Sequence, residues 1–339
     1  MTSRVTASSA PTTTSCAAHT RLYRAGRLIT EGFPVEQISD HLADPQSVVW
    51  LDLLEPDAGD LVVITEELGL HPLAIEDAVH DRQRPKVDVY DDHLFLTCYL
   101  VGYRSGEPLD VAEVAAFVTD RALVTVRKSE GIDLEPVLQA WDAAGESAAQ
   151  SGVAFLLHGL LDHVVDGHFA VVQDLDDGVG ALEALLFSEQ GGGDELQRRT
   201  FALRKALVEL RRAVLPMREV VNTLLRRDLD LVSPNIAPYY QDVYDHVLRV
   251  AEWTESLRDL VGSILDTNAT LQSNRLNVTV RRLTAYAALL AVTTAITGYY
   301  GQNVPYPGFG TRAGFLVSTA LLVTAVVVVY ALLRRRKYF

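Results

Sequence analysis

The residues best placed for chemistry follow an apolar segment near the C-terminus. Residues 283–300 form an uncharged run of 18 residues, which leads into the tetrapeptide Tyr300-Gly301-Gln302-Asn303. Gly301 permits a sharp exit from a helix, and Asn303 then presents an uncharged amide. Four threonines give the run one small, mildly polar side: Thr284, Thr293, Thr294 and Thr297. In lipid such a side seeks a neighbouring helix or water, so tight helix packing and a pore lining are the two interpretations.

Two apolar runs are candidates for membrane spans, since a spanning helix needs about 20 residues. The first is 283–300, and the second, 313–333, has 21 residues rich in valine and leucine. Two arginines precede the first run, four bases follow the second, and only Arg312 lies between them. The positive-inside rule therefore predicts two spans, with both chain termini in the cytoplasm and residues 301–312 outside. Two spans cannot enclose a pore, so a pore lining would also require several subunits.

Charge divides the chain at the start of the first run. The 339 residues include 30 Lys or Arg and 44 Asp or Glu, a net charge of −14. No acid follows residue 280, whereas seven bases do, so residues 1–280 carry 23 bases against 44 acids, a net −21. The overall balance argues against a nucleic-acid partner, which needs clustered lysine and arginine. Cys16 and Cys98 are too few for a disulfide framework, which fits a reduced, cytosolic setting.

The rest of the chain alternates short apolar runs with helical stretches and then becomes helical. A helix is predicted at 61–68, and strands at 48–53, 93–103, 114–119 and 122–127, the last two joined by a tight hairpin. Apolar residues at three- and four-residue intervals predict a long helix after residue 151, and a second one from Asp194 to about Asp230. No proline interrupts 239–300, which predicts one helix of about 93 Å.

These patterns define an α+β membrane protein in seven segments. In order they are a disordered Ser/Thr-rich extension (1–20), an α/β cytoplasmic domain (21–150), antiparallel long helices (151–232), a stalk helix that continues into the first span (239–300), an outer loop (301–312), the second span (313–333) and a basic cytoplasmic tail (334–339). The first twenty residues lack the apolar core of a secretory signal peptide, and a site of regulatory phosphorylation is the other interpretation of them.

Several stretches of the chain resemble one known family. Its members carry a Tyr-Gly-Met-Asn loop between two C-terminal spans, which corresponds here to Tyr300-Gly301-Gln302-Asn303. Four upstream stretches are also similar and occur in the same order: HPLAIEDAVHDRQRPKVDVY (71–90), LVELRRAVLPMREV (207–220), PYYQDVYDHVLRV (238–250) and SNRLNVTVRRLT (273–284). Over about residues 40–339 the sequence resembles the CorA family of divalent-metal transporters, the two-span GxN family.

The resemblance implies a funnel-shaped homopentamer in the plasma (inner) membrane, whose long helix lines a pore for Mg²⁺. Gly301, Gln302 and Asn303 would form the selectivity filter, where a ring of amides hydrogen-bonds the hydration shell that Mg²⁺ sheds reluctantly. Counting back from Asn303 in helical repeats gives the pore-lining residues: Thr294, Ala291, Ala287, Thr284, Leu283, Val280 and Asn277. Leu283 and Val280 would form an apolar constriction. A basic ring would surround the inner mouth: Arg334, Arg335, Arg336 and Lys337.

The resemblance also implies regulation by cytosolic Mg²⁺. Glu76 and Asp77 of one subunit and Asp242 of its neighbour would bind the ion between them. Five domains of net charge −21 repel one another, and a cation between facing carboxylates relieves this repulsion. If the closed state binds Mg²⁺ better, rising cytosolic Mg²⁺ shifts the population toward closed.

Departures from the family pattern leave the transported ion open. Gln302 replaces the usual methionine, Val292 stands where the first span usually has a proline, and the outer loop has Arg312 but no acid. Zinc transporters of the ZntB type also vary the middle residue of Gly-x-Asn, so Zn²⁺, Co²⁺ and Ni²⁺ are alternatives to Mg²⁺. A non-conducting, membrane-anchored oligomer that senses metal is the alternative from a different class.

Other motifs give no indication of an enzyme. The sequence has no Gly-x-x-x-x-Gly-Lys loop, nucleophile elbow or His-Glu-x-x-His pair, so we expect no organic cofactor, and transport driven by the ion gradient and membrane potential. His158, His163 and His168 are spaced by five residues, which turns each ring by about 140° from the last. They do not share a helix face and are not expected to bind one metal ion.

Overall fold

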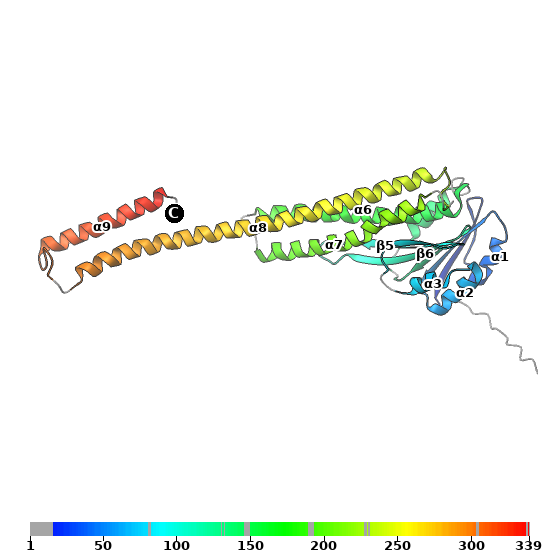
Figure 1. Ribbon diagram of the computed structural model, residues 1–339, viewed down its shortest axis with the longest axis horizontal. Coiled ribbons are helices and arrows are strands. Elements are labelled where there is room, and N and C mark those ends of the chain that lie inside the picture. Colours follow the sequence, from blue (N-terminus) through cyan, green and yellow to red (C-terminus); the bar gives the residue numbers. More distant parts are fainter. Residues whose placement is uncertain are drawn as a thin grey trace, which may run out of the picture. The chain divides into compact units, whose positions relative to one another are not determined.

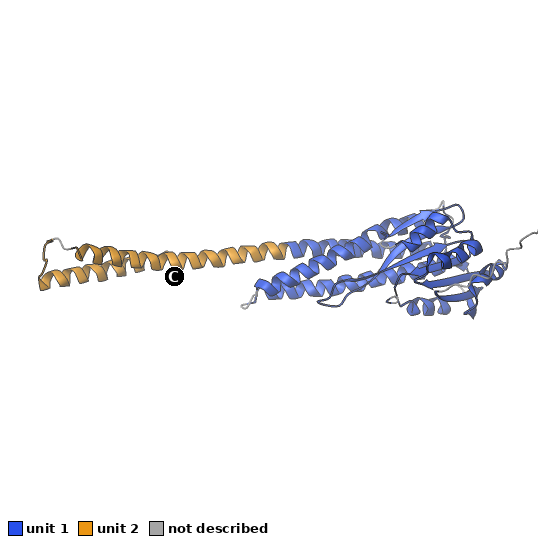
Figure 2. Ribbon diagram, turned by 90° about the horizontal axis from the view of Figure 1, so that it is seen from below, with its two compact units in different colours: residues 1–262 blue, residues 263–339 orange. Residues whose placement is uncertain are grey.

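The computed structural model (Figure 1) describes residues 16–80, 83–129, 131, 133–145, 150–188, 193–226, 229, 231–302, 305–336 and 338. The chain forms two compact units, which comprise residues 1–262 and 263–339 (Figure 2). The division falls inside one helix, α8 (Ala237–Tyr300), and not in a loop. The predicted segments 21–150 and 151–232 therefore lie within a single compact unit.

The first unit is built on a mixed sheet of seven strands. In chain order they are β1 (Ala17–Arg24), β2 (Arg27–Glu31), β3 (Ser47–Leu54), β4 (Lys86–Val89), β5 (Leu94–Gly102), β6 (Asp110–Val118) and β7 (Ala122–Arg127). Across the sheet the order is β2-β1-β3-β7-β6-β5-β4, and among the described strands only β3 and β7 pair in parallel. β6 and β7 pair antiparallel around Asp120 and Arg121, which confirms the predicted hairpin.

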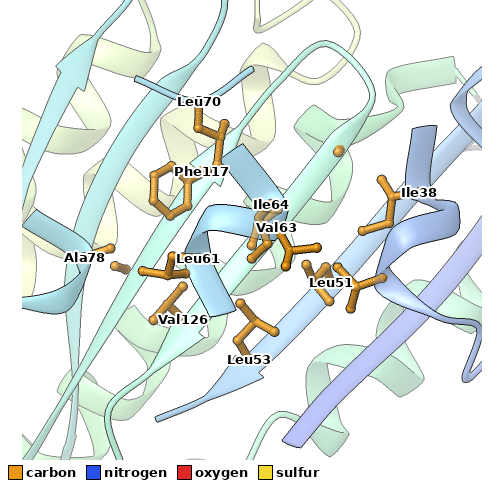
Figure 3. Close-up of a cluster of buried hydrophobic side chains, with 14 of the residues drawn as sticks. Ile38, Leu51, Leu53, Leu61, Val63, Ile64, Leu70, Ala78, Phe117 and Val126 are labelled. Atoms are coloured by element: carbon orange, nitrogen blue, oxygen red, sulfur yellow. The ribbon is translucent and has the colours of Figure 1, made fainter. Parts of the chain in front are cut away.

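Short helices cover one face of this sheet. They are η1 (Val35–Gln37), α1 (Ile38–Leu42), α2 (Ala58–Leu68) and α3 (Pro72–Val79). Alternation along β3 turns Leu51 and Leu53 toward this face. There they join Leu61 and Ile64 of α2 in a cluster of fully buried side chains (Figure 3). The cluster fixes α2, and α3 packs beside it.

The opposite face carries α4 (Glu135–Ala143) and the two long helices α6 (Val153–Leu186) and α7 (Gly193–Leu224). α4 and α6 pack together, α6 contacts β5, and α7 packs on α6 and reaches β4 and β5. Trp50 of β3 meets Trp141 of α4 on this face, edge to face, with ring centroids 5.4 Å apart. The long amphipathic helix predicted after residue 151 is confirmed by α6, which buries residues at three- and four-residue intervals.

The second unit consists of the C-terminal part of α8 and of α9 (Arg312–Arg335). α9 lies beside that part of α8 in both views (Figures 1 and 2). Its first turn is capped by Thr311, whose hydroxyl accepts the Gly314 N–H at 3.1 Å. After Pro238 in its first turn, α8 is uninterrupted, as the absence of proline from 239–300 predicts.

Two predicted boundaries need correction. Residues 17–20 were expected in a disordered extension, but they begin β1, which pairs with β3 from Ala17 to Arg24. Backbone hydrogen bonds to a strong neighbouring strand hold a segment whose own sequence has little strand character. The second long helix ends at Leu224 and not near Asp230, because the N–H of Arg226 turns back to the Thr223 carbonyl. Residues 1–15 of the extension lie outside the described part of the chain.

Candidate functional site

A stripe of exposed side chains runs along the C-terminal part of α8. All seven residues predicted to line a pore belong to it: Asn277, Val280, Leu283, Thr284, Ala287, Ala291 and Thr294. Steps of mostly three or four residues place them on one face of the helix. Each is exposed in the single chain, and Leu283 is 68% and Val280 51% exposed although both are large and apolar. We call these seven residues the α8 stripe.

The opposite side of α8 is the partly buried one in this unit. Ala285 is fully buried, and Leu289, Val292 and Ile296 are partly buried. At 100° per residue these positions lie about half a turn from the α8 stripe. α9 is the neighbouring helix here (Figure 2), and the stripe stays bare beside it. One chain therefore presents a continuous face that mixes apolar, threonine and asparagine side chains, and none of the described residues of its unit covers this face.

Helical hydrogen bonding continues past the last residue of α8 to Gly301. The N–H of Gly301 donates to the Thr297 carbonyl at 2.9 Å. A Cβ at residue 301 would lie 3.0 Å from that oxygen, which explains the glycine. Gln302 is exposed at the start of the loop. Asn303, the predicted filter amide, lies outside the described residues.

The rest of this loop is held by aromatic rings that the sequence analysis did not identify. Tyr300, Tyr306 and Phe309 follow one another edge to face, with centroids 5.1 and 5.3 Å apart. Gly308 has a φ of +90°, and its backbone lies so close to Gly314 that a Cβ at Gly314 would overlap the Gly308 carbonyl. The loop returns to α9 through this glycine contact.

The basic end of the unit joins the two helices. Arg281 of α8 donates from Nη2 to the Arg336 carbonyl at 3.2 Å, and its guanidinium lies 5.1 Å from the ring centroid of Tyr338. Arg281 thus caps the C-terminal end of α9. The predicted basic ring is exposed at this end: Arg334, Arg335 and Arg336. Lys337 lies outside the described residues.

The predicted regulatory acids Glu76 and Asp77 lie on α3, which is capped by His71. The His71 ring accepts the Leu73 N–H at 3.2 Å through Nδ1. Glu76 is exposed, whereas the Asp77 carboxylate accepts a hydrogen bond of 2.6 Å from Nζ of Lys86. Partial burial alone would lower the pKa of Lys86, but hydrogen bonds to Asp77 and Asp88 outweigh it and raise that pKa.

A second group of potential ligands lies where α6 and α8 pass each other in the first unit. One oxygen each from Asp162 and Asp166 and one ring nitrogen of His246 lie within 4.8 Å of one another. The predicted ligand Asp242 is exposed one helical turn before His246. Partial burial and the Asp162 charge raise the pKa of Asp166, and the charge of Asp242 adds to this effect. We call Asp162, Asp166 and His246 the α6–α8 cluster.

The donor set of the α6–α8 cluster fits a divalent cation. Two carboxylates suit Mg²⁺, and an imidazole nitrogen adds affinity for Zn²⁺, Co²⁺ or Ni²⁺. The negative charges of Asp162 and Asp166 repel each other, and a cation bound between the two carboxylates would remove this repulsion. The histidines considered from the sequence face other partners: His158 packs edge-on to Tyr240, and His168 is buried with Nε2 2.7 Å from the Tyr99 carbonyl oxygen.

Known proteins resemble this chain in sequence and in fold. Residues 45–335 match the family described as CorA-like Mg²⁺ transporter protein. The chain belongs to the CorA family. It is 28% identical over 298 residues to the cobalt/magnesium transport protein CorA of Thermotoga maritima, covering 87% of this chain and 84% of the relative. The zinc transport protein ZntB of Yersinia enterocolitica is 23% identical over 305 residues, which cover 88% and 90% of the two chains. The structure of the CorA magnesium transporter of Methanocaldococcus jannaschii superposes with a TM-score of 0.75 at 19% identity, covering 95% of this chain and 98% of that one.

In this CorA-family chain, sequence reasoning missed the partners of the acids. Asp162 and Asp166 are four residues apart, as are Asp242 and His246, so each pair shares a helix face. That spacing was visible in the sequence. What it did not reveal is that α6 and α8 bring Asp166 and His246 together. The sequence likewise did not indicate that Lys86 forms an ion pair with Asp77.

Proposed function

We propose that the protein is one subunit of a divalent-cation channel, with Mg²⁺ as the main cargo and Co²⁺ or Ni²⁺ as further ions. The α8 stripe carries this proposal. It is a long helix face, exposed among the described residues, with Asn277 and Thr294 at its ends and apolar side chains between them apart from Thr284. Two helices cannot surround an aqueous path, so five copies arranged as a homopentamer, each contributing its stripe, would form the wall of a pore.

The membrane-spanning segments of this proposal are the C-terminal part of α8 and α9. Three helices in the described part of the chain are long and apolar enough to span a membrane: α6, α8 and α9. α6 has half of its apolar window buried within the first unit, where it contacts β5. α9 has none of its window buried, as expected for a helix that faces lipid. Bases at Arg281 and Arg334 favour a cytoplasmic location for both ends.

Transport would follow from hydration and voltage. Asn303 amides at the outer mouth would hold hydrated ions, and Thr294 and Asn277 would offer hydroxyl and amide groups along the path. Leu283 and Val280 would close the path by excluding water. An inward-moving divalent ion gains roughly 4.6 kcal/mol per 100 mV, twice the value for a single charge. No organic cofactor takes part in this scheme.

Regulation would use the carboxylates of the first unit. Cytosolic Mg²⁺ bound by Glu76 and Asp77 of one subunit and Asp242 of the next would favour the closed pentamer. The α6–α8 cluster would supply a further cation position close to Asp242, because Asp242 lies one turn of α8 before His246. Mg²⁺ would thus be both cargo and regulator.

A second candidate cargo is Zn²⁺. His246 would suit regulation by such a cargo, since an imidazole nitrogen in the α6–α8 cluster is a better ligand for Zn²⁺ than for Mg²⁺. Similarity to ZntB over most of both chains also supports it. In this version the protein remains a transporter, and only the preferred ion changes.

Flux into proteoliposomes tests the proposal. The purified full-length protein should admit Mg²⁺ under an inside-negative potential, and Zn²⁺, Co²⁺ and Ni²⁺ tested separately give the order of preference. Asn303→Ala, with the fold intact, should reduce the flux by about tenfold or more if the amide ring holds the hydrated ion. An absence of flux for all four ions would contradict transport and favour a non-conducting, metal-sensing oligomer.

A further inference from the structure

Asp77, the predicted cation ligand on α3, already has a cationic partner within its own chain. Nζ of Lys86 on β4 lies 2.6 Å from Oδ2 of Asp77 and 2.7 Å from Oδ2 of Asp88. One ammonium group therefore joins a carboxylate of a helix to a carboxylate of the sheet edge. The three side chains are 25% (Lys86), 29% (Asp77) and 40% (Asp88) exposed, so solvent screens this arrangement only in part.

The strand holds Lys86 in this position. β4 pairs with β5 so that Lys86 lies opposite Thr97 and Asp88 opposite Phe95. Alternation along the strand puts Lys86 and Asp88 on the same side of the sheet. Nζ also lies 5.7 Å from the Phe95 ring centroid, a distance that suits a cation–π contact. The ammonium is thus kept beside Asp77 at a high and constant effective concentration.

We propose that Lys86 is a tethered competitor that sets the concentration at which the cytosolic cation binds. A divalent ion that binds the Asp77 carboxylate competes with the Lys86 ammonium, because the ammonium already holds Oδ2 and neutralises the charge that attracts the ion. Asp88 then remains as the partner of Lys86, so that displacement leaves no unpaired charge behind. This inference rests on the proposed function, since it takes Asp77 as a ligand of the regulatory ion.

Competition by Lys86 would raise the cytosolic Mg²⁺ concentration at which the regulatory position fills. Without Lys86, Asp77 would attract cations with its full charge, and the regulatory position would fill at low Mg²⁺. With the ammonium in place, an incoming ion gains only the difference between its own attraction and that of Lys86. Closure is then delayed until cytosolic Mg²⁺ is abundant, which suits a protein that must stay open while the ion is scarce.

Limited proteolysis of the full-length protein in detergent measures cation binding independently of transport. Mg²⁺ is added at constant ionic strength, and the concentration that gives half-maximal protection is determined. Lys86→Met removes the charge and keeps the length of the side chain, and we expect this midpoint to fall about three- to tenfold. Asp88→Asn leaves the ammonium with Asp77 alone, and the midpoint should rise. Thermal unfolding without Mg²⁺ checks that each variant is folded.

The ion pair of Lys205 and Glu209 on α7 provides matched controls, with Nζ and Oε1 3.8 Å apart. Lys205→Met and Glu209→Gln change the net charge by the same amounts, and neither should move the midpoint. An unchanged midpoint in Lys86→Met, or an equal fall in Lys205→Met, would overturn the competitor role. The competitor role would also be overturned if Asp77→Asn left the protection by Mg²⁺ the same as in the wild-type protein. A wild-type protein that Mg²⁺ does not protect at all would count against the proposed regulation itself.

Discussion

Gly159 of α6 lies directly against the indole of Trp141 of α4. A Cβ at residue 159 would lie 2.5 Å from Nε1 and 3.1 Å from Cδ1 of that ring. Trp141 is only 1% exposed, and its ring also contacts Trp50 of β3. The glycine therefore allows α6, α4 and the sheet to meet at one point.

Replacing Gly159 with alanine should destabilise the first unit. The Trp141 ring is enclosed by Trp50 and α6, so overpacking should cost about 1–3 kcal/mol. Gly180→Ala is the matched control on the same helix, because nothing lies within 4 Å of a Cβ there. That change should be neutral or stabilise by about 0.5–1 kcal/mol. Thermal unfolding followed by tryptophan fluorescence distinguishes the two, and equal melting temperatures would contradict the packing argument.

Acid should weaken the first unit through His168. Burial lowers the pKa of His168 to about 4, although its hydrogen bond with the Tyr99 carbonyl acts in the other direction. In the unfolded chain a histidine has a pKa of about 6.5, so the unfolded state binds the proton first as the pH falls. The stability is complete above pH 6.5 and is lost progressively toward pH 4, by about 3 kcal/mol.

The dependence should be much smaller in His168→Gln, whose amide can still donate to the Tyr99 carbonyl but does not titrate in this range. The exposed His19 on β1 gives the control variant, His19→Gln, which should keep the wild-type pH profile. The melting temperatures of the three proteins between pH 7.5 and 4.5 provide the comparison. Parallel profiles for wild type and His168→Gln would show that another group is responsible.

The strands that the sequence predicted are those with strong local patterns. β3 and β7 are runs of valine and leucine, and their burial follows from composition. β1 reads AAHTRLYR and has no such pattern, yet it forms a full-length ladder with β3. Its strand state depends on a partner some thirty residues away, which no local window contains.

The candidate sites also differ in how far local sequence could predict them. The α8 stripe follows from periodicity along one helix, so counting residues was enough to place its members on one face. The α6–α8 cluster joins Asp162 to His246, which are distant in sequence, and depends on how two helices pack. The contact of Lys86 with Asp77 joins a helix, α3, to an edge strand, β4, and depends on how these two elements are placed in the fold. Local chemistry could be predicted, whereas the partners of each charge required the tertiary fold.

Replacing His246 should change the metal preference of the α6–α8 cluster. His246→Gln removes a nitrogen ligand and keeps an oxygen donor, so stabilisation by Co²⁺ should fall by more than stabilisation by Mg²⁺. His163→Gln is the control, because His163 is near Asp166 but outside the cluster. The rise in melting temperature at increasing metal concentration measures both effects. An equal loss for both ions in His246→Gln would indicate that the imidazole is not a ligand.

Adjacent threonines on α8 separate a pore lining from helix packing. Thr294 belongs to the exposed α8 stripe. Thr293 is partly buried on the other side, and its hydroxyl donates to the Leu289 carbonyl at 2.9 Å. Valine has nearly the same shape as threonine and lacks the hydroxyl. Thr294→Val should therefore remove a polar ring from the ion path and slow Mg²⁺ flux by about tenfold, or roughly 1.4 kcal/mol in barrier height.

Thr293→Val should leave the flux within about twofold of wild type, since its hydroxyl is already bonded to the backbone of its own helix. Both variants are measured in proteoliposomes at matched protein density, and cross-linking checks that each forms the same oligomer. If the two substitutions slow the flux equally, the threonines act through helix packing and not through contact with the ion. If Thr293→Val alone slows it, the pore wall is the opposite face of α8, and the stripe then faces lipid or another subunit.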